Sequence, residues 1–375
     1  MSSKAAKDAH PGRLAVPAVE RLAPYVPGKP ISELEREYNV HDIIKLASNE
    51  NPYGPSPQAL AAMRSALDEL WLYPDGSSHA LKTALATHLS VDPACITLGN
   101  GSNDLLMLLA EAFLTPSNNA IHSQYGFAIY PLVIRATGAR AIEVPALATD
   151  SAMPMGHDLD AMLAAIDAQT RLVYIANPNN PTGTWASPDA VRDFIRKAGP
   201  DTLVVLDEAY FEYGRLRGTQ DGMRWLADSP NLVVTRTFSK AYGLAGARVG
   251  YSVSHPEVAE VLNRVRPPFN VNSIAQVGAR AVLADPSHMQ HAVEQTMHEL
   301  TRVEAAIKAM KLWSAPSATN FLLVRTGVAA GQVYERLLRD GVIVRPIGLS
   351  DALRISIGTP AQNDRMLAAL ARALS

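Results

Sequence analysis

Three short apolar runs in the middle of the chain contain no alternating polar positions, and they cover residues 172–176, 203–206 and 232–234. This pattern is typical of strands that are buried on both faces of a sheet. Stretches with helical spacing separate them, as at residues 188–197. Strands that alternate with helices predict right-handed crossovers and a mostly parallel sheet flanked by helices. Because ligands bind beyond the carboxyl ends of such strands, we expect the side chains that carry chemistry directly after each run.

Helical spacing of apolar positions also occurs before this sheet, at residues 57–70 and 78–89, and a turn-rich loop from Trp71 to Gly76 lies between the two segments. Residues 1 to about 30 are rich in proline, glycine and charge, which favours an extended arm over a packed element.

The pattern changes beyond about residue 285. A long helical segment at residues 289–310 is followed by strand-like runs at 320–324, 342–344 and 353–357 and by a final helix. These elements predict a second, smaller α/β unit.

At 375 residues the chain is too long for one ordinary hydrophobic core. We therefore expect an α/β protein in three parts. An N-terminal arm with part of the small domain would cover residues 1–45, a large domain 46–285, and a small C-terminal α/β domain 286–375.

Composition excludes several classes of protein. Hydrophobic residues make up 47% and charged residues 19%, as in a globular enzyme, and the formal net charge of -2 provides no field that would attract nucleic acid or an anionic membrane. Cys95 is the only cysteine, which excludes an internal disulfide and a cysteine-based metal site. Residues 1–22 lack the apolar core of a secretory signal, and no apolar run reaches the ~18 residues of a membrane helix. We expect a cytoplasmic protein without a metal site.

A carboxylate follows directly after the second apolar run, at Asp207. An unpaired charge beside a buried strand is costly, so this side chain should have a cationic partner. A pyridinium nitrogen would serve, because an aspartate that keeps the nitrogen protonated makes pyridoxal 5'-phosphate (PLP) a better electron sink. The alternative role is a helix N-cap. After the first run, residues 177–183 form a rigid turn whose asparagines offer donors at the same edge, although a plain Asn/Pro/Gly turn has the same composition.

The third run leads to Thr237, Ser239 and Lys240 and, after two glycines, to Arg248. A lysine can form a Schiff base when burial or cationic neighbours depress its pKa. The hydroxyls and the guanidinium would hold a dianionic phosphate, with Arg248 as the strongest contact. By itself a lysine in such a loop is more often a solvated surface residue, so its assignment depends on the other residues.

Small residues from Gly99 to Asp104 precede a helix that is expected to begin at Leu105. Backbone N–H groups at a helix N-terminus bind anions. The segment is not a dinucleotide fingerprint, because Asp104 occupies the sixth position of G-x-G-x-x-G. We interpret it as a second phosphate contact.

Taken in order, these residues resemble the fold-type I PLP-dependent aminotransferases and, within them, the histidinol-phosphate aminotransferases. The resemblance covers nearly the whole chain and depends on an ordered series of segments at 22–25, 49–52, 73–76, 99–104, 177–183, 207–210, 237–240 and 353–358. It implies a fold-type I structure, PLP as cofactor and a homodimer with a shared active site. It also implies transamination of L-histidinol phosphate with 2-oxoglutarate to imidazole acetol phosphate and glutamate, a step of histidine biosynthesis.

The resemblance implies roles for particular residues. Lys240 would carry the cofactor as a Schiff base and move the proton between substrate and cofactor, and Asp207 would pair with the pyridine nitrogen. The other cofactor-binding residues implied are Ser102, Asn103, Tyr125, Asn180, Tyr210, Thr237, Ser239, Arg248 and Tyr73. Among these, Tyr125 would stack on the ring, and Tyr73 would reach the phosphate from the second subunit.

The substrate-binding residues implied are Tyr25, Asn49, Arg345 and Arg354. Arg354 matches the arginine that binds the anionic end of the substrate, Arg345 a second arginine near it, and Tyr25 a residue that closes over the site. A guanidinium accepts a phosphate or a carboxylate alike, so the arginines do not name the substrate. A surface salt bridge is the alternative role for each of them.

Three other functions stay open at this point: an aromatic amino acid aminotransferase, a phosphothreonine decarboxylase, and a PLP-binding regulator of transcription. The regulator would need a DNA-binding domain ahead of the aminotransferase part, and the resemblance is expected to begin too early to leave room for one. Residues 212–217 match no role in the family and predict a solvated surface loop.

Overall fold

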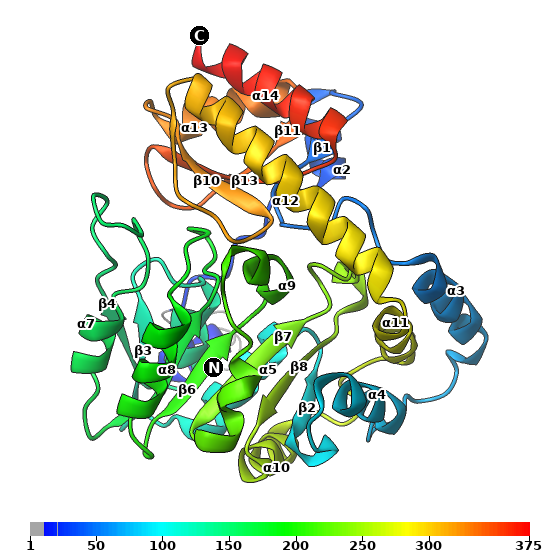
Figure 1. Ribbon diagram of the computed structural model, residues 1–375, viewed down its shortest axis with the longest axis vertical. Coiled ribbons are helices and arrows are strands. Elements are labelled where there is room, and N and C mark those ends of the chain that lie inside the picture. The colour runs from blue at the N-terminus through cyan, green and yellow to red at the C-terminus, as the bar shows by residue number, and fades with distance from the viewer. Residues whose placement is uncertain (1–10, 21) are drawn as a thin grey trace, which may run out of the picture.

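The computed structural model describes residues 11–20 and 22–375, and it consists of a large central sheet covered by helices and a smaller sheet above it in the view of Figure 1. The central sheet has seven strands in the order β2-β8-β7-β6-β5-β3-β4. Its strands are β2 (Ile96–Gly99), β3 (Asn119–Ser123), β4 (Arg140–Val144), β5 (Thr170–Ala176), β6 (Leu203–Asp207), β7 (Leu232–Thr237) and β8 (Gly250–Ser254). Only β8 runs antiparallel to its neighbours in this sheet, so β5, β6 and β7 end side by side at one edge.

Helices cover both faces of the central sheet because alternate side chains of its buried strands point to each face. One face packs against α5 (Ser102–Phe113), α6 (Ile129–Ala136) and α10 (Pro256–Val265). The other packs against α7 (Leu159–Ala164) and α8 (Pro188–Lys197). This three-layer arrangement is the expected α/β fold.

A third group of helices lies beyond β2 in Figure 1 and contains α3 (Pro57–Ser65), α4 (His79–Leu89) and α11 (Ser273–Ala284), and α11 contacts both of the others. From there the long helix α12 (Pro286–Ala309) extends to the smaller sheet.

The smaller sheet is antiparallel, with the order β12-β13-β10-β9. Its strands are β9 (Trp313–Ser314), β10 (Phe321–Arg325), β12 (Arg345–Pro346) and β13 (Ala352–Ser356), and α13 (Ala330–Arg339) and α14 (Pro360–Leu374) accompany it.

The N-terminal part of the chain joins this C-terminal part, as the blue and red ribbons of Figure 1 show. β1 (Ile44–Lys45) pairs in parallel with β11 (Val342–Ile343). Leu34 of α2 (Ile31–Tyr38) packs against Leu338 and Ile343. The exact domain boundaries at residues 45 and 285 stay predictions.

The remaining elements are short. They are η1 (Pro11–Leu14), α1 (Pro17–Glu20), η2 (Ala66–Glu69), η3 (Pro93–Cys95), α9 (Phe211–Gly214), η4 (Arg215–Arg217), η5 (Gly222–Asp228) and η6 (Ala245–Ala247). Within residues 11–20 and 22–375, no helix is both long enough and apolar enough to cross a membrane.

Three local predictions are wrong in part. The segment 212–217 is not a solvated loop throughout, because Glu212 and Tyr213 are buried in α9, and Tyr213 belongs to the main hydrophobic core. The arm of residues 1–30 contains the helical turns η1 and α1, while its residues 1–10 and 21 lie outside the described residues. The helix expected at Leu105 begins earlier, at Ser102.

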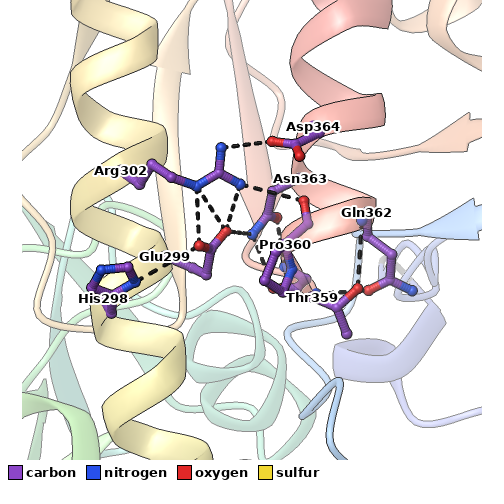
Figure 2. Close-up of polar contacts among 9 residues, drawn as sticks. His298, Glu299, Arg302, Thr359, Pro360, Gln362, Asn363 and Asp364 are labelled. Atoms are coloured by element: carbon purple, nitrogen blue, oxygen red, sulfur yellow. Dashed lines mark hydrogen bonds and ion pairs between the residues drawn. The ribbon is translucent and has the colours of Figure 1, made fainter.

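A buried glutamate joins α12 to the start of α14 (Figure 2). The Glu299 carboxylate, in a side chain that is 3% exposed, accepts hydrogen bonds from the guanidinium of Arg302 and one of 2.8 Å from Asn363 Nδ2. Asn363 also bonds both the N–H and the carbonyl of Gly358. The bonding to Arg302 holds the pKa of Glu299 below its ordinary value. The network therefore fixes the end of β13, the strand that carries Arg354, relative to α12.

Glu299→Gln should destabilise the protein by roughly 1.5–3 kcal/mol near neutral pH, the usual contribution of hydrogen bonds to a charged group. Because the folded pKa lies below the ordinary 4.5, the contribution of Glu299 is present above that value and is lost as the pH falls through the folded pKa. Urea unfolding at neutral and at acidic pH measures the difference between the two chains, which should shrink on acidification. Glu294→Gln, at an exposed glutamate of the same helix, is the matched control, and an equal loss in both variants would contradict the network's role.

Candidate active site

The carboxyl ends of β5, β6 and β7 open onto a cavity. The start of α5, the arm residue Tyr25 and the arginines Arg345 and Arg354 of the smaller sheet complete its wall. The cavity therefore lies between the two sheets and depends on the position of both.

Lys240 lies just beyond the end of β7 and is half-buried. Its Nζ donates a hydrogen bond of 3.0 Å to the backbone oxygen of Ser48 and lies 5.9 Å from the centre of the Tyr210 ring. Burial, together with the positive charge of Arg354, lowers the pKa of Lys240 to about 7. Much of this amine is therefore uncharged at neutral pH, and the uncharged amine is the nucleophilic form.

Asp207 ends β6 with its carboxylate buried. Its Oδ2 accepts a hydrogen bond of 2.8 Å from the Tyr130 hydroxyl, and its Oδ1 accepts one of 3.2 Å from Thr235 Oγ1. Among residues 11–20 and 22–375, no cationic side chain forms an ion pair with it, and burial raises the pKa of Asp207. The alternative of a helix N-cap is wrong, because Tyr210 is the N-cap of α9. The site thus lacks the positive charge that this carboxylate requires.

A phosphate cradle lies on the other side of the cavity. α5 begins at Ser102 without a side-chain cap, so the N–H groups of its first turn stay available to an anion. Arg248 Nη1 donates a hydrogen bond of 3.2 Å to Ser239 Oγ. Gly101 leaves room for this guanidinium, because a Cβ at that position would lie 2.1 Å from Arg248 Nη2. The guanidinium, the hydroxyls and the helix start suit a dianion.

Arg354 enters the cavity from β13. Its Nη1 donates a hydrogen bond of 2.6 Å to Asn180 Oδ1, and its Nη2 donates one of 2.5 Å to the backbone oxygen of Ala47. Its buried Nε has no hydrogen-bond partner in the part of the chain that the structure describes. Among the residues that the structure describes, no carboxylate pairs with Arg354, so the guanidinium keeps its capacity to bind an anionic group of a ligand.

Arg345 and Tyr25 form the mouth of the cavity. Arg345 Nη2 donates hydrogen bonds to the backbone oxygen of Val26, at 2.5 Å, and to the Tyr25 hydroxyl, at 3.4 Å. The guanidinium carbon lies 5.6 Å from the centre of the Tyr25 ring, which is a cation–π contact. The N-terminal arm therefore lies against the substrate side of the site.

Asn49 joins the two halves of the site. Its Nδ2 donates a hydrogen bond of 2.8 Å to the Tyr210 hydroxyl, and its Oδ1 accepts one of 2.8 Å from Ser356 Oγ at the end of β13. Burial raises the pKa of Tyr210 to about 12, so the phenol stays protonated at neutral pH. A donor in this position suits an oxygen atom of a bound ring.

The structure brings most of the predicted residues together. Those that line the cavity are Tyr25, Asn49, Ser102, Asn103, Asn180, Asp207, Tyr210, Thr237, Ser239, Lys240, Arg248, Arg345 and Arg354. Tyr125 instead lines an adjoining cavity, which shares Asn180 and Arg354 with the first. Tyr73 is 82% exposed, and its ring stacks on Phe269 at 4.8 Å. The roles of these residues toward a cofactor stay predictions.

Sequence reasoning missed two aromatic residues of the site. Phe127 lines the cavity two positions after Tyr125, and Tyr130 donates to Asp207. Phe127 lies between β3 and α6, Tyr130 lies in the first turn of α6, and neither follows an apolar run of the kind that located the other strand ends. The Tyr125-Gly126-Phe127 sequence was the available signal.

The arrangement fits a ligand with a phosphate at one end and a protonated ring nitrogen near Asp207, with a carbonyl carbon accessible to the Lys240 amine. Gly101 provides room beside Arg248, Asp207 lacks a cation, and Lys240 has a lowered pKa. PLP has these features, so the residues present fit that cofactor.

Comparison with known proteins agrees with this fit. Residues 41–370 match the family described as aminotransferase class I and II. Histidinol-phosphate aminotransferase 2 of Pseudomonas fluorescens is 52% identical over 96% of this chain and 98% of its own length, and that of Pseudomonas aeruginosa is 51% identical over the same shares. The crystal structure of histidinol-phosphate aminotransferase from Sinorhizobium meliloti in complex with PLP is 33% identical, with a TM-score of 0.88 over 96% of this chain and 97% of that one.

Gly101→Ala should weaken the binding of inorganic phosphate about tenfold or more, because the new Cβ would displace the guanidinium that forms the charge-assisted hydrogen bonds of the cradle. The positive φ of 85° at Gly101 adds backbone strain. Calorimetric titration of the two chains with phosphate measures the change. Gly246→Ala, in the turn just before Arg248 where a Cβ would meet no atom within 4 Å, should bind like the unmodified chain. Comparable losses in both variants would count against the cradle.

Proposed function

Because the chain belongs to the class I and II aminotransferase family, we propose that it transfers the amino group of L-histidinol phosphate to 2-oxoglutarate with PLP as its cofactor. The products would be imidazole acetol phosphate and glutamate, a step of histidine biosynthesis. The observation that carries the activity is that a lysine amine of lowered pKa, an unpaired buried carboxylate and a phosphate cradle surround one cavity. The names of relatives about half identical to this chain support the choice of substrate.

Bound PLP supplies an aldehyde for the amino group and an electron-withdrawing ring. Asp207 would accept a hydrogen bond from the ring nitrogen and keep it protonated. Ser102, Ser239 and Arg248 would hold the phosphate, with N–H groups of the first turn of α5. The Tyr210 hydroxyl, fixed by Asn49, would donate to the ring oxygen.

Lys240 would hold the cofactor and would act as the general base at the substrate Cα. An amine with a pKa of about 7 can both take and return a proton near neutral pH. The hydrogen bond to the carbonyl of Ser48 holds the amine at the cavity wall.

Arg354 and Arg345 would bind the anionic end of the substrate, with Tyr25 covering it from the arm. The same guanidinium accepts the phosphate of histidinol phosphate and the α-carboxylate of glutamate, which a two-step reaction with both substrates requires. An aromatic amino acid aminotransferase and a phosphothreonine decarboxylase would use the same arginines.

We expect L-histidinol phosphate to bleach the visible absorption of the PLP-loaded chain, and 2-oxoglutarate to restore it. Phenylalanine, tyrosine and phosphothreonine are tested one at a time as alternative amino donors, and carbon dioxide release is recorded for phosphothreonine.

Lys240→Ala should lack both the visible band and turnover, because it removes the anchor and the base. Conversion of phenylalanine or tyrosine with no response to histidinol phosphate would sink the substrate assignment, and wild-type turnover by Lys240→Ala would sink the assignment of the lysine.

We further propose a cytoplasmic homodimer in which Tyr73 of each subunit reaches the cofactor phosphate of the other. The loop between α3 and α4 supports this, because Trp71 and Tyr73 are each 82% exposed and Phe269 beside them is also exposed. Large exposed apolar groups that lie together are typical of protein interfaces. A single cysteine and a biosynthetic reaction suit the reducing cytoplasm.

Mixing Lys240→Ala subunits with Tyr73→Ala subunits should restore activity, because each heterodimer would contain one site with both residues intact. Random mixing should recover about a quarter of the wild-type rate, since half of the dimers are mixed and each has one intact site. Each variant alone is the control. No recovery in a sample whose subunit exchange is verified by mass spectrometry would contradict the shared site.

A further inference from the structure

Tyr130 is the residue of α6 whose hydroxyl reaches Asp207. The side chain is fully buried, and its hydroxyl donates a hydrogen bond of 2.8 Å to Asp207 Oδ2. Its ring stacks on Tyr174, with centres 4.9 Å apart and planes 15° apart, and meets Phe127 edge-on at 5.8 Å. The ring is therefore fixed by aromatic contacts to β5 on one side and to a cavity-lining residue on the other.

The turn before α6 passes close to the Tyr130 ring, and Gly126 permits this approach. A Cβ at Gly126 would lie 3.3 Å from Tyr130 Cδ2 and 2.9 Å from the backbone oxygen of Ser123. The neighbouring Tyr174 has a separate use for its hydroxyl, which donates to the backbone oxygen of Leu106 at 3.3 Å. Two buried, stacked tyrosines thus differ in one respect, because only Tyr130 donates to the carboxylate.

The bond from Tyr130 is the shortest that the Asp207 carboxylate accepts. The other donors are Thr235 Oγ1 at 3.2 Å and the N–H of Ala209 at 3.3 Å. The other titratable or charged groups that line the same cavity are Tyr25, Tyr210, Lys240, Arg248, Arg345 and Arg354, and Tyr174 stacks on Tyr130. Burial and the nearby carboxylate raise the pKa of Tyr130 far above its ordinary value. The phenol therefore stays protonated and can donate this hydrogen bond from acidic to mildly alkaline pH.

We propose that Tyr130 is a positioning residue of the reaction: its hydroxyl orients the Asp207 carboxylate and stabilises its ionised form, the form that pairs with a protonated ring nitrogen. The inference depends on the proposed function, because it requires a cofactor with such a nitrogen. The physical reason is that a buried carboxylate without strong donors takes up a proton, and a neutral carboxyl group no longer stabilises a pyridinium.

Tyr130→Phe tests this because it keeps both ring contacts and removes only the hydroxyl. The dissociation constant of pyridoxamine 5'-phosphate, which binds without a covalent bond to Lys240, is measured by calorimetry on the full-length, cofactor-free chains across a series of pH values. Loss of the donor raises the pKa of Asp207, so the ratio of the variant's constant to that of the unmodified chain should be near one at alkaline pH. It should rise to about tenfold or more as the pH falls. Protonation of the ligand and of Lys240 affects both chains and cancels in the ratio.

Tyr174→Phe is the matched control, because it removes an equally buried hydroxyl from the stacked neighbour without touching Asp207. Its ratio should stay near one at every pH. Thr235→Val removes the second hydroxyl donor and should give a smaller rise with the same pH dependence, which keeps the test decisive if Tyr130→Phe folds poorly. A ratio for Tyr130→Phe that does not change with pH, or equal changes in both tyrosine variants, would overturn the proposal. If the unmodified chain does not bind pyridoxamine 5'-phosphate, the proposed function fails instead.

Discussion

This site depends on a carboxylate that is buried at the end of a central strand and for which the described residues provide no cationic partner. Asp207 ends β6 and is neighboured in register by Ala176 of β5 and Thr235 of β7. The protein stabilises it with neutral hydroxyl donors and leaves its charge uncompensated. An ionised carboxylate in such a place is stable when the ligand brings the positive charge. The ionised state of Asp207 therefore depends on a bound cationic ligand.

The other charges of the cavity are likewise left for ligands to complete. Burial and Arg354 push the Lys240 amine toward its neutral form, while Arg354 itself bonds amide and carbonyl oxygens and no carboxylate. The cavity thus has one unpaired anion at the sheet edge and guanidinium groups around it. A molecule with a cationic ring nitrogen and a phosphate, together with an anionic substrate, satisfies these groups in one arrangement. The charge pattern of the whole cavity therefore specifies the combination of ligands better than any single residue does.

The sequence predicted those parts of the fold whose signal is local. β5, β6 and β7 are buried on both faces, so their apolar runs are continuous, and residues at or just beyond their ends line the cavity. β3 and β4 gave no such signal, because β3 contains Asn119, His122 and Ser123, and β4 is an edge strand with exposed positions. Glu212 looked solvated from its charged neighbours, yet tertiary packing of α9 buries it. Tyr130 was not predicted, because its contact with Asp207 joins residues 77 positions apart. The contact depends on how α6 is oriented against the sheet, and sequence periodicity does not determine that orientation.

The position of the smaller sheet is as important to the site as the central sheet. Arg354 lies in the middle of β13, and Ser356 at its end bonds Asn49, which in turn fixes the hydroxyl of Tyr210, just beyond the end of β6. Behind β13, Glu299 and Asn363 hold Gly358 to α12, and at its other side Arg345 of β12 contacts Tyr25 of the arm. A shift of β13 would therefore change the anion-binding arginine, the phenol beside the cofactor and the cover of the cavity together. If Arg354 binds the substrate and Tyr210 the cofactor, as we propose, the two contacts are coupled through this one strand, and a change that loosens its attachment to α12 acts on both without touching either ligand.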